Sequence, residues 1–184
     1  MQQPWRSAPA MRALAEGELI AYPTEAVWGL GCDPFNERAV ASLLNLKRRA
    51  RTKGLILVAA HPLQLQPLRA ALTDAQWQQL CELRAEPTTW LLPNHGCMPP
   101  WICGAHDSVA VRISAHPVVA SLCKRFGDLL VSTSANPAGM SPARSELAAR
   151  RYFGKQVACY VSGATGGAAK PSQIIDLVSG RRLR

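Results

Sequence analysis

The chain has 184 residues, of which 48% are hydrophobic, and Lys and Arg outnumber Asp and Glu by 21 to 12, for a formal net charge of +9. This length and composition predict a single globular domain over residues 1–184 and argue against a disordered chain or a second independent domain. The sequence contains no apolar run of the ~18 residues that a membrane span needs, and its first residues lack the apolar stretch of a secretion signal. We therefore expect a cytoplasmic protein that does not contact a membrane.

The hydrophobic pattern predicts helices and strands that alternate irregularly. Gly17 ends the first helix, Thr73 and Gln76 form a capping box, and Pro23–Pro34 is expected to be a loop. In chain order we expect helix 9–16, strand Glu18–Tyr22, helix Asn36–Leu46, strand Leu55–Ala59, helix Asp74–Arg84, strands Thr88–Leu92 and Ser108–Ile113, a helix opened by Pro117, strand 129–133, helix 145–153, and strands near 157–161 and 173–178. This order predicts an α/β domain with a strongly twisted mixed sheet and flanking helices.

The excess of positive charge favours polyanionic partners such as nucleotides or RNA, although a basic surface without such a partner is about as common. The six cysteines include no CxxC pair, so we expect free thiols. His95, Cys97, Cys103 and His106 fall within twelve residues, but their spacing matches none of the common zinc patterns. Free side chains on a loop are the expected interpretation, and a metal site at these four residues is the open alternative.

Two segments resemble phosphate-binding loops but lack residues that such loops require. GATGGAAKPS (Gly163–Ser172) lacks the glycine before the lysine, and Pro171 separates that lysine from the serine. GLGCDP (Gly29–Pro34) lacks the third glycine of a dinucleotide-binding loop. Any nucleotide must therefore be held in another way.

A basic segment, LKRRARTK (Leu46–Lys53), follows the second predicted helix. If the chain is extended from Lys47 onward, Lys47 and Arg49 project from the same side while Arg48 points away. Two adjacent cations suit a triphosphate, and arginine can bind its oxygens in a bidentate manner. The competing interpretation is a solvated cationic turn.

The strand SVAVRIS (108–114) has an apolar face and a second face made of small residues around Arg112. An arginine above a floor of small residues leaves space for a ligand, and a carboxylate is the natural one. An arginine on a solvent-exposed strand is the alternative. The apolar face contains Val109, Val111 and Ile113, and the other face contains Ser108, Ala110, Arg112 and Ser114.

The segment LLVSTSANPAG (129–139) begins as a buried strand and ends in hydroxyl and amide side chains. In an extended chain Ser132, Ser134 and Asn136 project from the same side, and the turn Pro137–Gly139 brings free backbone N–H groups close to them. These neutral donors suit phosphate oxygens. A polar strand end that satisfies its own turn is the alternative.

Five segments together resemble the YrdC/TsaC family of threonylcarbamoyl-AMP synthases. They are IAYPTEAVWGLGCDP, LKRRARTKGLIL, VAVRISAHP, LLVSTSANPAG and KPSQIIDL, and they occur in the order and at about the spacing of that family. The resemblance extends from about Gly17 to Arg184, and the chain length is similar to that of the short single-domain bacterial form.

The resemblance implies a curved α/β fold with a basic cavity and an ATP-dependent activity. The implied reaction converts ATP, L-threonine and bicarbonate into L-threonylcarbamoyl-adenylate and pyrophosphate, with Mg²⁺ accompanying ATP. The product serves the threonylcarbamoyladenosine modification of tRNA position 37, so the implied partners are downstream tRNA threonylcarbamoyl transferase proteins, and direct binding of tRNA or double-stranded RNA is left open.

The resemblance also implies roles for individual residues. The family's Lys-x-Arg and Ser-x-Asn tetrad falls on Lys47, Arg49, Ser134 and Asn136, which are expected to be catalytic and, with Ser108, to bind the nucleotide. Ala26 stands where many relatives have a hydroxyl that contacts threonine, which leaves selectivity for threonine open, and Arg184 matches a nucleotide-side arginine. The residues expected to bind threonine are Thr24, Arg112, Thr133 and Ser172, and no protein ligand to a metal is implied.

Two other functions remain open at this level. A non-catalytic RNA-binding or ribosome-maturation factor is compatible with the positive charge and the basic segment. A carbamoyl-handling domain of the hydrogenase-maturation kind has the same fold, but it usually belongs to a much longer chain.

Overall fold

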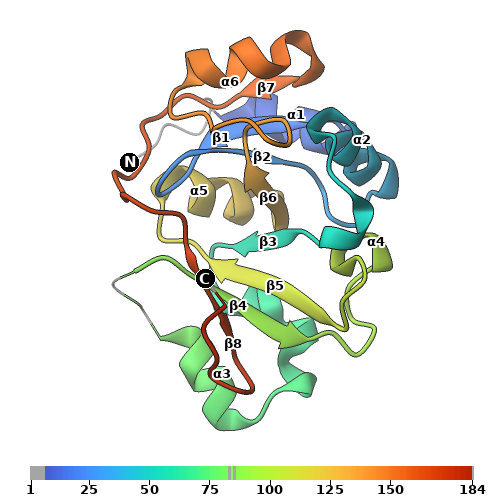
Figure 1. Ribbon diagram of the computed structural model, residues 1–184, viewed down its shortest axis with the longest axis vertical. Helices are drawn as coiled ribbons and strands as arrows, with labels where there is room; N and C mark the ends of the chain where they lie inside the picture. Colours follow the sequence, from blue (N-terminus) through green and yellow to red (C-terminus); the bar gives the residue numbers. More distant parts are fainter. Residues whose placement is uncertain (1–6, 83, 85, 184) are drawn as a thin grey trace.

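The computed structural model describes residues 7–82, 84 and 86–183 (Figure 1). Arg184, which the sequence analysis assigned to the nucleotide, lies outside these residues. The helices are α1 (Ala8–Ala15), α2 (Glu37–Lys47), α3 (Asp74–Cys81), α4 (Pro100–Cys103), α5 (Pro117–Phe126) and α6 (Glu146–Phe153), with a 3₁₀ helix at Pro62–Ala71. The strands are β1 (Ile20–Pro23), β2 (Trp28–Gly31), β3 (Ile56–Ala59), β4 (Thr88–Pro93), β5 (Ser108–Ile113), β6 (Leu130–Ser134), β7 (Cys159–Tyr160) and β8 (Gln173–Asp176).

The eight described strands form one mixed sheet in the order β7-β1-β2-β6-β3-β5-β4-β8. Three neighbouring pairs are parallel (β7 with β1, β3 with β5, and β4 with β8), and the other pairs are antiparallel. Figure 1 shows the twist of this sheet between its β7 end and its β8 end. The predicted fold class, an α/β domain with a twisted mixed sheet and flanking helices, is confirmed.

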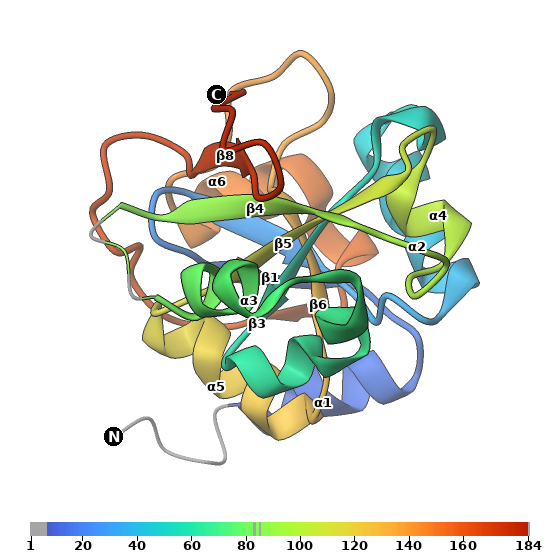
Figure 2. The same cartoon turned by 90° about the horizontal axis from the view of Figure 1, so that it is seen from below.

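Side-chain alternation along the central strands gives the sheet two apolar faces. Ile20 and Leu130 pack with α1 and α5 in one cluster, and these two helices lie on one side of the sheet in Figure 2. Ala21 and Val131, their neighbours in sequence, belong to a larger cluster with α2, α6 and the 3₁₀ helix. None of the helices within the described residues has the length and hydrophobicity of a membrane span.

Local sequence signals explain where several helices begin and end. The side chain of Asn36 caps α2 by accepting a hydrogen bond from the backbone N–H of Ala39. The predicted capping box of Thr73 and Gln76 opens α3, but this helix ends at Cys81, before the predicted Arg84. Helix α5 begins at Pro117, as predicted, and stops before Gly127, whose φ of 85° lies in the left-handed region that favours glycine.

The prediction of a loop over Pro23–Pro34 is wrong, because this segment contains strand β2. Two of the four residues of β2 are glycines, which are unfavourable in strands and made the segment look like a loop. Gly31 is required by its neighbours, since a Cβ atom there would lie 2.4 Å from the backbone oxygen of Val131. The 3₁₀ helix and α4 were also missed, because both lie in proline-containing segments.

Candidate functional site

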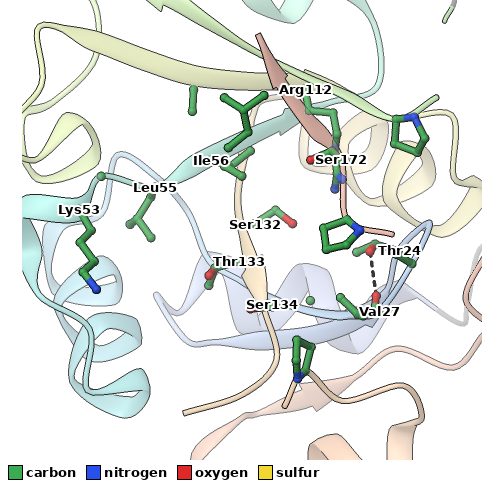
Figure 3. Close-up of a pocket in the computed structure, with 18 of the residues that line it drawn as sticks. Thr24, Val27, Lys53, Leu55, Ile56, Arg112, Ser132, Thr133, Ser134 and Ser172 are labelled. Atoms are coloured by element: carbon green, nitrogen blue, oxygen red, sulfur yellow. Dashed lines mark hydrogen bonds between the residues drawn. The ribbon is translucent and has the colours of Figure 1, made fainter. Parts of the chain in front are cut away.

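A cavity of about 490 Å³ lies on the same face of the sheet as α1 and α5, beyond the end of their apolar cluster (Figure 3). Along β6 and β3, Leu130 and Val58 pack under α5, and Ser132 and Ile56, two residues away, line the cavity. Side chains two residues apart on a strand lie on the same face, so this one face of the sheet forms part of the apolar core under α5 and then the floor of the cavity. The hydroxyls at the end of β6 are explained by this change of surroundings.

The strand register separates the two ends of the cavity. Ile56 pairs with Ala110 on one side and with Ser132 on the other. Because β3 and β5 are parallel and β6 is antiparallel, Ser108 and Ser134 both lie toward the start of β3, while Arg112 lies toward its end. Ser108 and Arg112 are four positions apart along β5, which corresponds to about 13 Å. We call the part near Ser108 and Ser134 the serine end and the part near Arg112 the arginine end.

The predicted faces of β5 agree with the structure. Arg112 and the two alternate small residues before it line the cavity, whereas Val109 and Val111 are buried in the core on the opposite face. Arg112 is also buried, with 9% of its surface exposed. A guanidinium in this position can bind a carboxylate within the cavity.

Seven of the predicted site residues line one cavity, although they come from five separate parts of the chain. The arginine end also receives Ser172, whose hydroxyl lies 2.8 Å from that of Thr89. Thr133 leaves β6 on the side opposite Ser132, as Figure 3 shows, so Ser132 and, by alternation, Ser134 are the β6 hydroxyls on the same face as Arg112. The seven are Thr24, Arg49, Ser108, Arg112, Thr133, Ser134 and Ser172.

Lys47 does not project into this cavity. It is the last residue of α2, and its ammonium donates hydrogen bonds to the backbone oxygens of Ser134 and Asn136, the second at 2.7 Å. The prediction of an extended chain from Lys47 is wrong, because Lys47 still belongs to α2. Arg48 follows it as the C-cap residue of the helix and is in the left-handed conformation, with φ of 51°. Lys47 therefore fixes the end of β6 and places a positive charge behind it.

The side chains of Arg49 and Asn136 also do not follow the positions that an extended, alternating chain predicts. Arg49 lines the cavity and donates a hydrogen bond of 2.9 Å to the backbone oxygen of Gly54. The prediction that Asn136 continues the face of Ser134 is wrong, because β6 ends at Ser134. The amide of Asn136 instead donates to the backbone oxygens of Pro137 and Met140.

The electrostatics of the cavity favour anionic ligands. Among the described lining residues, the cations are Arg49, Lys53, Arg112 and Lys170, and the carboxylate is Glu25. Glu25 and Lys170 received no role in the sequence analysis, although both lie in the motifs quoted there. His106 and Cys103 also line the cavity, but within the described residues no three His, Cys, Asp or Glu side chains are placed to hold a metal ion.

Burial, together with the charge of Arg49, lowers the pKa of Lys47 from 10.5 to about 8. If phosphate binding requires the charged ammonium, kcat/KM for a phosphate-containing substrate should fall as the pH rises above about 8. The unfolded chain binds the proton more tightly than the folded chain, so the free energy of unfolding should rise with pH between about 8 and 10.5 as far as this group is concerned. A pH profile of kcat/KM, compared with thermal unfolding at each pH, checks this expectation, and an alkaline loss of activity that accompanies unfolding would contradict it.

Comparison with known proteins finds similar sequences and a similar fold elsewhere. Residues 12–184 match the model of the Sua5/YciO/YrdC family, whose description is "Telomere recombination". The threonylcarbamoyl-AMP synthase of Cellvibrio japonicus is 51% identical to this chain over 175 residues, which are 95% of this chain and 93% of that protein. The threonylcarbamoyl-AMP synthase of Pseudomonas paraeruginosa is 50% identical over 98% of this chain and 97% of its own length. The crystal structure of P. abyssi Sua5 complexed with L-threonine superposes on this chain with a TM-score of 0.88 at 29% identity. The matched region is 96% of this chain and 52% of that chain.

Proposed function

The chain belongs to the Sua5/YciO/YrdC family, and we infer that it is an enzyme that makes L-threonylcarbamoyl-adenylate from L-threonine, bicarbonate and ATP. Relatives named threonylcarbamoyl-AMP synthase match nearly its whole length at about 50% identity, which favours this activity over a non-catalytic RNA-binding function. The observation that supports it best is one cavity with two chemically different ends. L-Threonine is the substrate at the arginine end, and ATP and bicarbonate are proposed for the remainder.

The serine end suits the triphosphate. Arg49 and Lys53 supply positive charge there, and the hydroxyls of Ser108 and Ser134 are neutral donors. Lys47 adds a charge from behind β6. In our proposal these groups stabilise the negative charge that develops as pyrophosphate leaves the α-phosphorus. The assignment of Asn136 to the nucleotide stays a prediction.

The arginine end suits threonine. The guanidinium of Arg112 binds the substrate carboxylate, and Thr24, Ser132 and Ser172 provide hydrogen-bonding groups around the side chain. Ala26 also lines the cavity and has no hydroxyl to offer. The amine of threonine condenses with bicarbonate to give a carbamate and water, and an oxygen of the carbamate then attacks the α-phosphorus while pyrophosphate leaves. Catalysis then depends on positioning and charge neutralisation.

Mg²⁺ is proposed to enter with ATP. The serine end offers the neutral oxygens of Thr133 and Ser134, and the cavity's carboxylate, Glu25, lies at the arginine end beside Arg112. This donor set fits a cation whose ligands are mainly phosphates and water, with a hydroxyl oxygen as the protein ligand. When bound, Mg²⁺ supplies charge neutralisation at the phosphates.

Pyrophosphate release tests the proposed activity. With ATP and Mg²⁺ present, release should require both threonine and bicarbonate, and it should stop when EDTA removes the metal and resume when excess Mg²⁺ is added. Release that does not depend on threonine would contradict the function, and release that continues in EDTA would contradict the role of Mg²⁺.

The biological setting is proposed from the product. We place the enzyme in the cytoplasm, where ATP, threonine and tRNA are available, and propose that its product passes to the proteins that modify tRNA at position 37. Direct contact with tRNA or double-stranded RNA is compatible with the charge of +9.

A further inference from the structure

Glu25 forms a charged pair with Arg112 inside the cavity. One carboxylate oxygen of Glu25, Oε2, lies 3.4 Å from Nη2 of Arg112, and the exposed fractions of the two side chains are 16% and 11%. The other oxygen, Oε1, accepts a hydrogen bond of 2.6 Å from the hydroxyl of Ser114. The arginine end therefore carries adjacent positive and negative groups.

The pair keeps free hydrogen-bonding capacity. Among the described residues, Oε2 of Glu25 and Nε of Arg112 are buried and have no hydrogen-bond partner. Such groups are costly to bury unless a ligand completes their bonding. Both residues line the cavity, so a ligand placed there can bind both groups.

The backbone around Glu25 is held by the loop 163–172. Ala168 donates a hydrogen bond of 2.8 Å to the backbone oxygen of Glu25, and Gly166 donates one of 3.0 Å to that of Thr24. A Cβ atom on Gly166 would lie 3.1 Å from the Cα atom of Glu25, so this glycine permits the close contact. Glu25 is thus a positioned group.

We propose that Glu25 binds the ammonium group of the amino-acid substrate while Arg112 binds its carboxylate. An α-amino acid carries its ammonium and carboxylate groups on the same carbon atom, and the adjacent Glu25 and Arg112 provide the complementary negative and positive charges. The other charged lining residues that the structure describes are cations, which repel an ammonium group. This inference rests on the proposed function and adds the group that distinguishes an amino acid from a simple carboxylic acid.

The test compares L-threonine with 2,3-dihydroxybutanoate of matching configuration, in which a hydroxyl replaces the ammonium, by calorimetric titration in the presence of an unreactive ATP analogue. Glu25→Gln should weaken threonine binding about ten- to a hundredfold. It should leave binding of the analogue unchanged or tighter, because Arg112 loses its internal competitor. Glu16→Gln, which removes the same charge from the exposed end of α1, is the control and should change neither.

Three outcomes would overturn the proposal. Threonine binding that survives Glu25→Gln would make Glu25 a simple counter-ion of Arg112, and an equal loss for both ligands would mean that it only positions Arg112. If wild-type protein neither binds threonine nor releases threonine-dependent pyrophosphate, the proposed function fails together with this inference. If Glu25→Gln fails to fold, Glu25→Asp is the replacement variant, because it shortens the side chain by one methylene and moves the carboxylate back. It should again weaken the binding of threonine more than the binding of the analogue.

Discussion

Replacing Lys47 with Met should reduce threonine-dependent pyrophosphate release about a hundredfold or more, which is the usual effect of losing one preorganised charge-stabilising group. Met keeps an unbranched apolar side chain, one heavy atom shorter than that of Lys, but removes the ammonium that bonds to the backbone of Ser134 and Asn136. The phosphates lose a nearby charge, and the end of β6 loses its attachment to α2. Both effects weaken the serine end, so we expect a lower kcat and a higher KM for ATP, measured by steady-state kinetics.

Arg51→Met is the matched control for this variant. Arg51 belongs to the same basic segment, but it is exposed and lies 3.6 Å from Glu37 on the surface of α2. It removes the same charge outside the cavity and should retain activity within about twofold, as exposed ion pairs contribute little. Equal losses in the two variants would show that only the overall charge matters. Retention of half the activity in Lys47→Met would contradict a role for Lys47 at the phosphates.

Replacing Arg112 with Lys should raise KM for threonine about ten- to a hundredfold while leaving KM for ATP nearly unchanged. Lysine keeps the positive charge but lacks the planar fork that binds a carboxylate with two hydrogen bonds. ATP should be spared because the serine end lies about 13 Å away along β5. Initial rates with each substrate varied in turn measure the two KM values.

Arg125→Lys, on the exposed surface of α5, is the control for this exchange and should change neither KM. If KM for ATP rises as much as KM for threonine in Arg112→Lys, the two-ended description of the cavity is wrong. A variant with unchanged KM for threonine would show that Arg112 serves only as the partner of Glu25.

The parts of the site that could be predicted from the sequence lie on regular strands. The period of two in β5 places Arg112 on the cavity face, and the same period in β6 gives the position of Ser134. These predictions succeeded because both segments are extended over their whole length. The core positions around them follow the same alternation.

The predicted side-chain positions are wrong where a helix or strand ends. Lys47 is the last residue of α2 and Asn136 lies beyond β6, so the alternation of an extended chain did not apply to either. Whether such an end residue points into a cavity is decided by the carbonyl groups that it meets, and these come from distant parts of the chain. Sequence spacing alone does not contain that information.

Glu25 was missed for a different reason. It lies in the turn between β1 and β2, and β2 was itself unpredicted. Its partners, Arg112 and Ser114, are more than 80 residues away in sequence. An isolated glutamate in a predicted loop gives no signal of an internal ion pair, because its partners come close to it only in the folded sheet.

A crystal structure with L-threonine and an unreactive ATP analogue tests most directly the claim that one cavity holds both substrates at opposite ends. We expect the threonine carboxylate on Arg112 and the triphosphate between Arg49 and Ser134. Threonine bound elsewhere, or phosphates bound to Arg112, would contradict this account of the site.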